Sequence, residues 1–255
     1  MTHARSGSLW GGGFLGTFVL VHGAWHDGSA WNETARHLTG EGHKVFAPTM
    51  AGHGKFADRK VSHAQCTDSI VQFIAENSME DFVLLGHSFA GTIICKVAEA
   101  IPEKIRRLVF LNAFVLQDGH SLVDEVPPSH AALFDQLSRE SIDHTIMIPF
   151  PIWRESFVND AELEVAKWTY AQLSPEPYQP CIDKLDLKKF YSLQIAKSYI
   201  NCTEDTALPP GEWAWHPRMS SRLGLYRLVQ MPGSHEVLYT NPSGLAGKII
   251  EAGRD

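Results

Sequence analysis

The chain has 255 residues, a length that allows one large α/β domain or a core with a modest insertion. Hydrophobic residues make up 44% and charged residues 20%, which are ordinary values for a globular protein. Its formal net charge is -7 and no basic block offsets it, so we expect no nucleic-acid partner. No apolar run approaches the roughly 18 residues of a membrane span, so we expect no membrane partner either.

Residues 1–16 carry a short apolar run that three glycines interrupt. Because this run is too short for the core of a signal peptide, we expect a flexible leader and a cytoplasmic protein. The four cysteines form no C-x-x-C pair and show no metal-ligand spacing. Cys95 and Cys202 fall in apolar patterns, which predicts buried free thiols in a reducing compartment.

Strand-like and helix-like patterns alternate through residues 17–114. The predicted strands are Thr17–Val21, Lys44–Pro48, the run from Phe82 to Leu85, and Arg107–Asn112. The predicted helices are Ser29–Leu38, Cys66–Asn77 and Thr92–Ala98. This alternation predicts an α/β fold, a doubly wound and mostly parallel sheet that holds its ligand at the carboxyl ends of the strands.

Residues 115–190 break the alternation. They carry seven prolines, with helix-like pieces between them, of which Ala131–Leu137 and Ala161–Leu173 are the clearest. A strand-free insertion between two sheet strands predicts a helical cap over the active-site edge. The alternation resumes in residues 191–255, so 17–114 and 191–255 are predicted to form the core. The elements predicted there are strands Lys197–Cys202 and Tyr226–Met231 and helices His216–Leu223 and Pro242–Ala252.

A serine lies where the third predicted strand meets its helix, in Gly86-His87-Ser88-Phe89-Ala90-Gly91. This strand–turn–helix context is typical of a nucleophile elbow, in which a sharp turn exposes the serine Oγ at the sheet edge. The usual pattern is G-x-S-x-G, and here Ala90 takes the last position with Gly91 beside it. The alternative is a serine that only caps the helix.

A base and an acid follow the last two predicted strands. His235 comes directly after the last strand, and Asp205 comes 30 residues earlier, after the strand before it. The order Ser88, Asp205, His235 is the order of a serine–acid–histidine triad on this kind of sheet. Glu204 is the rival acid, and a solvated loop histidine is the alternative for His235.

An oxyanion hole requires two backbone N–H groups that point at the developing charge. We expect one from Phe89, the residue after the nucleophile, and one from Ala24 in the loop after the first strand. Gly23 would let that loop approach the serine closely. Trp25 either lines the pocket or packs in the core.

Metal and cofactor sites are disfavoured. His22, His26 and Asp27 have no third and fourth ligand at a fixed spacing. The chain has no G-x-G-x-x-G after a strand and no P-loop. We therefore expect no metal and no cofactor.

Four segments together resemble the α/β-hydrolase superfamily, in the branch of plant methylesterases and hydroxynitrile lyases with their bacterial esterase relatives. They are Val21–His26, Gly86–Gly91, Cys202–Asp205 and Gly233–His235. The resemblance implies Ser88 as nucleophile, Asp205 as orienting acid, His235 as base, and Ala24 and Phe89 as oxyanion donors.

Two positions depart from the lyases of that branch, which place a threonine after the first-loop histidine and a lysine after the catalytic histidine. Here those positions are Gly23 and Glu236. Because neither residue provides a cation to stabilise departing cyanide, these two positions favour a hydrolase over a hydroxynitrile lyase. We therefore expect a cofactor-free serine hydrolase that cleaves a small, aromatic carboxylic ester or carbamate ester.

Aromatic residues of the predicted cap are candidate pocket walls: Phe150, Trp153, Phe157, Trp168 and Tyr170. Packing within the cap would explain the same residues. The rival functions are a cofactor-free dioxygenase of the same fold, a hydroxynitrile lyase, and a small-molecule sensor that retains the triad. The expected partner is a small-molecule substrate, and the oligomeric state, with a homodimer among the options, is left open.

Overall fold

A computed structural model describes residues 15–255, so the expected leader lies, apart from its last two residues, outside the described part. Six parallel strands form one sheet in the order β2-β1-β3-β4-β7-β8. Their bounds are β1 Thr17–Val21, β2 Lys44–Phe46, β3 Phe82–His87, β4 Ile105–Leu111, β7 Ala196–Cys202 and β8 Arg227–Met231. The predicted strands are therefore found within one or two residues of their expected bounds.

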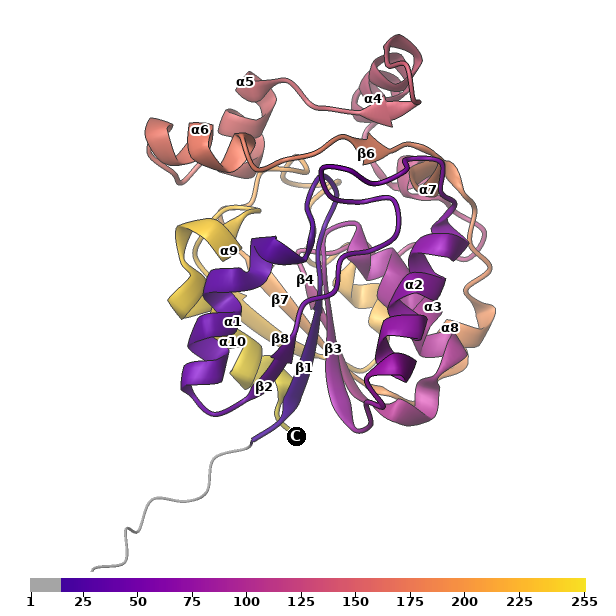
Figure 1. The fold of residues 1–255 in the computed structure, drawn as a ribbon, viewed down its shortest axis with the longest axis vertical. Helices are drawn as coiled ribbons and strands as arrows, with labels where there is room; N and C mark the ends of the chain where they lie inside the picture. Colours follow the sequence, from indigo (N-terminus) through magenta and orange to yellow (C-terminus); the bar gives the residue numbers. More distant parts are fainter. Residues whose placement is uncertain (1–14) are drawn as a thin grey trace, which may run out of the picture.

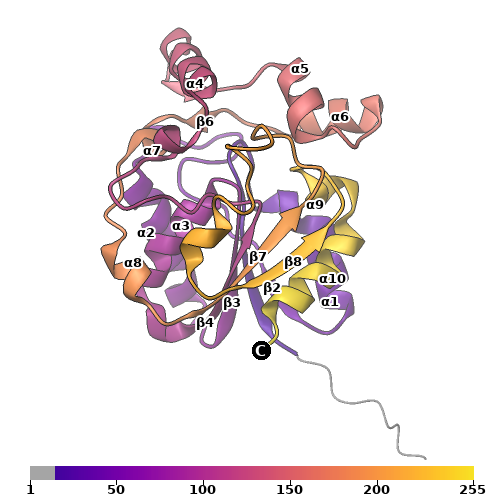
Figure 2. The same cartoon turned by 180° about the vertical axis from the view of Figure 1, so that it is seen from behind.

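Helices cover both faces of this sheet (Figures 1 and 2). On one face lie α2 (His63–Glu76), α3 (Ala90–Ala100) and α8 (Lys188–Ser192); on the other lie α1 (Asn32–Gly40), α9 (Val237–Thr240) and α10 (Pro242–Gly253). This is the predicted α/β fold with a doubly wound parallel sheet. The predicted helix His216–Leu223 is wrong over its first half, where the chain forms turns, and only a 3-10 helix at Ser220–Leu223 remains.

Alternation along the strands explains why both faces are apolar. In β1, Val19 and Val21 pack in the core under α2 and α3, whereas Phe18 and Leu20 pack in the core under α1 and α10. Successive side chains of a strand point to opposite faces, so a strand covered on both sides must be apolar throughout. All six residues of β3 are buried, so packing on both faces holds in place the strand that leads to Ser88.

Residues 115–190 are here called the cap. Their helices are α4 Pro128–Glu140, α5 Phe150–Ile152, α6 Leu163–Tyr170 and α7 Gln179–Ile182, with a π-helical turn at Trp153–Phe157. Most of the cap lies over the carboxyl edge of the sheet, whereas the end of the range, from α7 to α8, runs down beside α2 and α3 (Figure 1). The expectation of a strand-free insertion is wrong, because β5 (Thr145–Ile146) and β6 (Glu176–Pro177) pair antiparallel. Two residues per strand are too few for a visible alternation pattern. The division of the chain into core and cap units stays a prediction.

All four cysteines lie in the described part of the chain, where each is buried and unpaired. Between residues 15 and 255, no helix combines the length and the apolar character needed to cross a membrane. The cytoplasmic location stays a prediction.

Candidate active site

Ser88 lies at a strained turn between β3 and α3. Its φ is +54°, in the left-handed region that residues with a side chain seldom adopt. The turn is tight because a Cβ at Gly86 would come within 2.6 Å of the carbonyl oxygen of Ala90. The turn exposes the Ser88 hydroxyl at the carboxyl edge of the sheet, as a nucleophile elbow does.

The structure brings the three predicted triad side chains into one hydrogen-bonded chain. His235 Nε2 lies 2.9 Å from Ser88 Oγ, and His235 Nδ1 lies 2.6 Å from Asp205 Oδ2. Ser88 and His235 come from the loops after β3 and β8, and Asp205 comes from the loop after β7. The other carboxylate oxygen of Asp205 accepts the N–H of Ala207 at 2.8 Å, which fixes the orientation of the acid.

Glu204, the rival acid, points elsewhere. Its Oε2 accepts the N–H of Gly233 at 3.1 Å, and its own N–H donates to the carbonyl of Gly233 at 3.2 Å. Glu204 therefore ties the loop of His235 to the loop of Asp205 and does not contact the imidazole. His235 is buried, with 1% of its surface exposed, so the solvated-loop alternative does not describe it.

Burial and nearby charge act on His235 in opposite directions. Burial lowers its pKa, but the charge of Asp205 and its hydrogen bond, together with the charge of Glu236, raise it, and the net pKa lies above the ordinary value of 6.5. Glu236 is itself fully buried and accepts a hydrogen bond from His26 Nε2 at 3.1 Å. Burial raises the pKa of Glu236, but His26 and two further histidines lower it to about 2.

Two backbone N–H groups beside Ser88 are free of protein acceptors. Among residues 15–255, no hydrogen bond is donated by the N–H of Ala24 or of Phe89, and both residues line the cavity at Ser88. A Cβ at Gly23 would lie 3.0 Å from His87 Nδ1 and 3.1 Å from Ser88 Cβ. Glycine at this position therefore permits the close approach of the first loop, as predicted.

His22 orients the peptide that carries the Ala24 N–H. Its Nε2 accepts the N–H of Met50 at 3.1 Å, so its Nδ1 must carry the proton that it donates to the carbonyl of Gly23 at 2.9 Å. Burial and the neighbouring His53 hold the pKa of His22 well below its ordinary value, which keeps the ring neutral. Because the peptide is trans, fixing the carbonyl of Gly23 turns the N–H of Ala24 the opposite way.

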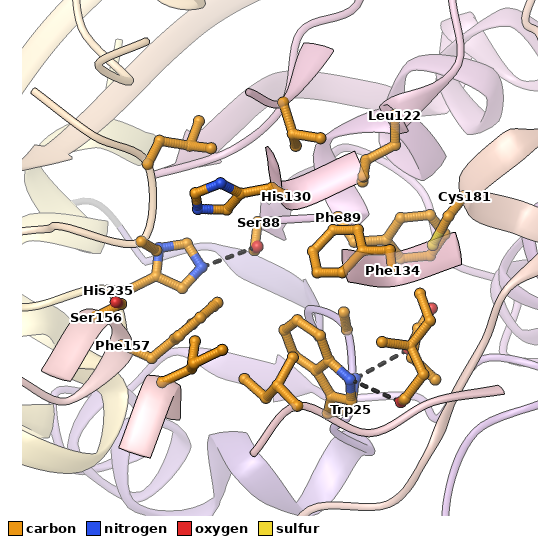
Figure 3. Close-up of a pocket in the computed structure, with 18 of the residues that line it drawn as sticks. Trp25, Ser88, Phe89, Leu122, His130, Phe134, Ser156, Phe157, Cys181 and His235 are labelled. Carbon is orange, nitrogen blue, oxygen red and sulfur yellow. Dashed lines mark hydrogen bonds between the residues drawn. The ribbon is translucent and has the colours of Figure 1, made fainter. Parts of the chain in front are cut away.

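A cavity of about 300 Å³ lies between the triad and the cap (Figure 3). Its walls are mainly apolar. Aromatic lining residues come from the sheet edge and from the cap: Trp25, Phe89, Phe114, Phe134, Phe157 and Trp215. Trp215 stacks on the ring of His235, with ring centroids 5.2 Å apart and an angle of 18° between the planes. The cavity is therefore a small, largely aromatic chamber with Ser88 and His235 on one wall.

Four of the aromatic residues predicted as pocket walls, Phe150, Trp153, Trp168 and Tyr170, are not among those lining this cavity. Phe150 packs against Tyr170, Trp153 is fully buried and donates from Nε1 to Thr169, and Trp168 is 55% exposed and packs on Tyr239. Aromatic content alone does not tell which side of a short helix faces the cavity. Trp25 and Phe157 do line it.

Sequence reasoning missed Phe134, Trp215 and Glu176 on the cavity wall. Phe134 lies in the predicted helix Ala131–Leu137, and a helical wheel of that segment could have found it. Trp215 and Glu176 lie in irregular stretches whose path the sequence pattern does not define.

Three potential ligand atoms of His87, His235 and Glu236 lie within 4.8 Å of one another. Both ring nitrogens of His235 already face Ser88 and Asp205, and Glu236 accepts from His26. His87 donates from Nε2 to the carbonyl of His235 at 3.0 Å, which supports the histidine loop. These donors serve the hydrogen-bond network, and the arrangement does not fit a metal.

The family model of the alpha/beta hydrolase family matches residues 18–248. The chain belongs to this family. An extracellular alpha/beta-hydrolase from a Paenibacillus species, described as sharing structural and functional homology with tobacco salicylic acid binding protein 2, has a solved structure. That structure superposes on this α/β hydrolase with a TM-score of 0.92, at 46% identity, covering 94% of this chain and 99% of the other.

Several curated relatives of this α/β hydrolase bear the names of esterases, and one bears the name of an alpha-hydroxynitrile lyase. A carbendazim hydrolyzing esterase of Nocardioides sp. (strain SG-4G) is 29% identical, over 94% of this chain and all of the relative. Methylesterase 2 of Arabidopsis thaliana is 33% identical, over 78% of this chain and 81% of the relative. The resemblance to the methylesterase branch is thus confirmed.

Proposed function

We propose that this α/β hydrolase is a serine hydrolase that cleaves small, neutral carboxylic esters or carbamate esters through an acyl-enzyme, without a cofactor. The observation that carries the proposal is the hydrogen-bonded chain from Ser88 through His235 to Asp205, at 2.9 and 2.6 Å, beside two free backbone N–H groups. The esterase names of the relatives support the same reaction class.

In the proposed reaction, Ser88 Oγ attacks the ester carbonyl while His235 Nε2 accepts the hydroxyl proton. The buried Asp205 carboxylate stabilises the imidazolium that forms, and the N–H groups of Ala24 and Phe89 hold the oxyanion. His235 then protonates the leaving alcohol. In the second half, His235 activates water, which releases the acid and regenerates Ser88.

The cavity supports the choice of substrate. Its volume of about 300 Å³ admits a compact group, and its aromatic walls suit an aryl or alicyclic one. No lysine or arginine is among the residues that line it, so the cavity has no permanent cation to pair with an anionic substrate. Burial lowers the pKa of His130, the histidine on the cap wall, which keeps it neutral.

The hydroxynitrile lyase alternative lacks the cation that departing cyanide requires. At the position of the lyase lysine stands Glu236, an anion whose Oε2 is bound to His26 and which does not line the cavity. Its negative charge, behind the base, would disfavour cyanide. We therefore expect no cyanide release from mandelonitrile above the uncatalysed background.

A substrate panel tests the proposal and its rivals together. The purified protein is assayed with p-nitrophenyl acetate, a methyl aryl ester, an aryl carbamate and mandelonitrile, each also with Ser88→Ala. We expect Ser88-dependent release of alcohol from at least one ester or carbamate. Turnover of none would favour the triad-retaining sensor, and cyanide release lost in Ser88→Ala would favour the lyase. Activity that survives Ser88→Ala would favour a dioxygenase-like use of His235 and Asp205.

A further inference from the structure

Glu176 is a buried carboxylate that joins three segments around the cavity. It lies on cap strand β6, lines the cavity wall and has no exposed surface. Its Oε2 accepts the backbone N–H of Trp25 at 2.9 Å and lies 2.9 Å from Nε2 of His53. The cap is thereby connected to the loop after β1 and to the loop after β2.

Trp25 depends on the cap for its conformation. Its φ is +66°, a left-handed conformation that is strained for a residue with a side chain. Besides the N–H held by Glu176, its carbonyl accepts the N–H of Ser174 at 2.9 Å, and its indole Nε1 donates to the carbonyl of Ile146 at 3.0 Å. All three partners belong to the cap, so the cap holds this turn at its backbone and at its side chain.

The turn at Trp25 adjoins the first oxyanion donor. The N–H of Ala24 belongs to the peptide that His22 orients from its N-terminal side, and Trp25 is the next residue. The N–H of Trp25 is the first backbone donor on the C-terminal side of Ala24, so loss of its bond to Glu176 would loosen the turn next to the oxyanion donor, although Ser174 and Ile146 would still contact Trp25. Glu176 therefore acts on the reaction through Trp25, as a positioning residue.

His53 provides the charge that allows a carboxylate at this place. Its Nδ1 lies 2.9 Å from the carbonyl of Ala51, an acceptor only, and its Nε2 faces Glu176, so both ring nitrogens donate. Burial lowers the pKa of His53, but Glu176 raises it and the net pKa is raised. The two side chains are 0% and 1% exposed, and a buried carboxylate requires such a partner. A charged acceptor also holds an amide N–H more firmly than a neutral one does.

We propose that Glu176, with His53 as its counter-ion, holds the oxyanion loop in its reactive geometry, so that the hole is complete only when the cap is docked. The inference rests on the proposed ester hydrolysis. It assigns to the cap a part in transition-state stabilisation in addition to its part in shaping the cavity.

Glu176→Ala and Glu176→Gln test this role, with Glu99→Gln as the matched control. Glu99 is also a buried carboxylate that accepts a backbone N–H, that of Phe190 at 3.0 Å, and pairs with a cation, Lys96, but it does not line the cavity. We expect Glu176→Ala to lower kcat by about 10²–10³-fold with KM within about threefold, because an oxyanion donor acts mainly on the transition state. Glu176→Gln keeps an acceptor for Trp25 and should lose about tenfold, whereas Glu99→Gln should keep kcat within about threefold.

The discriminating readout is inhibitor affinity. An aryl trifluoromethyl ketone forms an oxyanion on Ser88, whereas the corresponding aryl alkyl ether occupies the cavity without one. We expect the ketone to lose affinity in parallel with kcat in both Glu176 variants, and the ether to bind within about threefold of wild type. Two results would overturn the inference: Glu176→Gln with wild-type kcat and ketone affinity, or an equal loss in Glu99→Gln. A wild-type protein that hydrolyses no ester would refute the proposed function instead.

Discussion

The carboxyl edge of the sheet and the cap form opposite walls of one cavity, and they use polar groups differently. At the sheet edge, Ser88 and His235 turn polar atoms into the cavity, and short hydrogen bonds orient them. The cap presents mainly apolar side chains, such as Ile148 and Phe157, and directs polar atoms such as Trp153 Nε1 and Tyr170 Oη into its own packing. In the proposed reaction, the bond-making groups and the substrate-selecting groups thus lie in different segments of the chain.

This division predicts that variants at the sheet edge lower kcat, whereas variants at the cap wall raise KM. Glu176 is the exception, since it belongs to the cap but is bonded to the loop that carries the Ala24 N–H. The following substitutions test whether effects on kcat and effects on KM separate in this way.

The largest effect is expected from Ser88→Ala. It should lower kcat for an aryl ester by ~10³-fold or more, with a residue of activity from oxyanion binding alone. KM and the thermal unfolding midpoint should stay close to wild type, because the hydroxyl donates only within the site. A steady-state assay with a melting curve measures both, and a variant that retains most of its activity would contradict the serine mechanism.

Asp205→Asn should lower kcat by roughly 10²–10⁴-fold, because an amide would favour the wrong tautomer of His235. Glu204→Gln is the matched control, since Glu204 contacts Gly233 and not the imidazole. It should keep kcat within about threefold. The reverse order of effects in the same assay would assign the orienting role to Glu204.

The pH profile should reflect the raised pKa of His235. The base must be neutral to accept the serine proton, so kcat/KM should fall about tenfold per pH unit below that pKa. The midpoint of this acidic limb is expected above 6.5, the ordinary value for histidine. Glu236→Gln removes one of the charges that raise the pKa and should move the midpoint to lower pH. A wild-type midpoint below 6.5 would contradict the arrangement of charges described here.

The smallest effects are expected in the cap. Phe134→Ala removes a half-buried ring from the cavity wall and should raise KM for an aryl ester about 3- to 30-fold, at nearly constant kcat. Trp168→Ala, at an exposed position outside the cavity, should change neither value by more than about twofold. Equal effects of the two substitutions on KM would show that the cavity wall has been assigned to the wrong residues.

The contrast between the sheet edge and the cap also explains which parts of the fold and of the site could be predicted from the sequence. Parallel strands covered on both faces appear as uninterrupted apolar runs, so β1, β3 and β4 and the loops after them were predictable. The loops after β3, β7 and β8 end at one sheet edge, because the strands are parallel, and this brings Ser88, Asp205 and His235 together.

The cap was predictable as a helical insertion but not in its orientation. Its helices are short, for example three residues in α5 and eight in α6. One or two turns of helix show no reliable amphipathic face, so Trp153 and Trp168 could not be told from cavity residues. Glu176 was beyond prediction for another reason, since its partners Trp25 and His53 lie 151 and 123 residues away in the sequence.

Intact-protein mass spectrometry would detect the proposed covalent acyl-enzyme on Ser88 itself. The protein is mixed with p-nitrophenyl N-methylcarbamate, because carbamoyl enzymes react slowly with water and therefore accumulate. We predict one carbamoyl group per chain, mapped to Ser88 by peptide analysis, together with one equivalent of p-nitrophenol released in a burst. Steady release of p-nitrophenol at undiminished rate with no mass increase, or an adduct that persists in Ser88→Ala, would contradict the account.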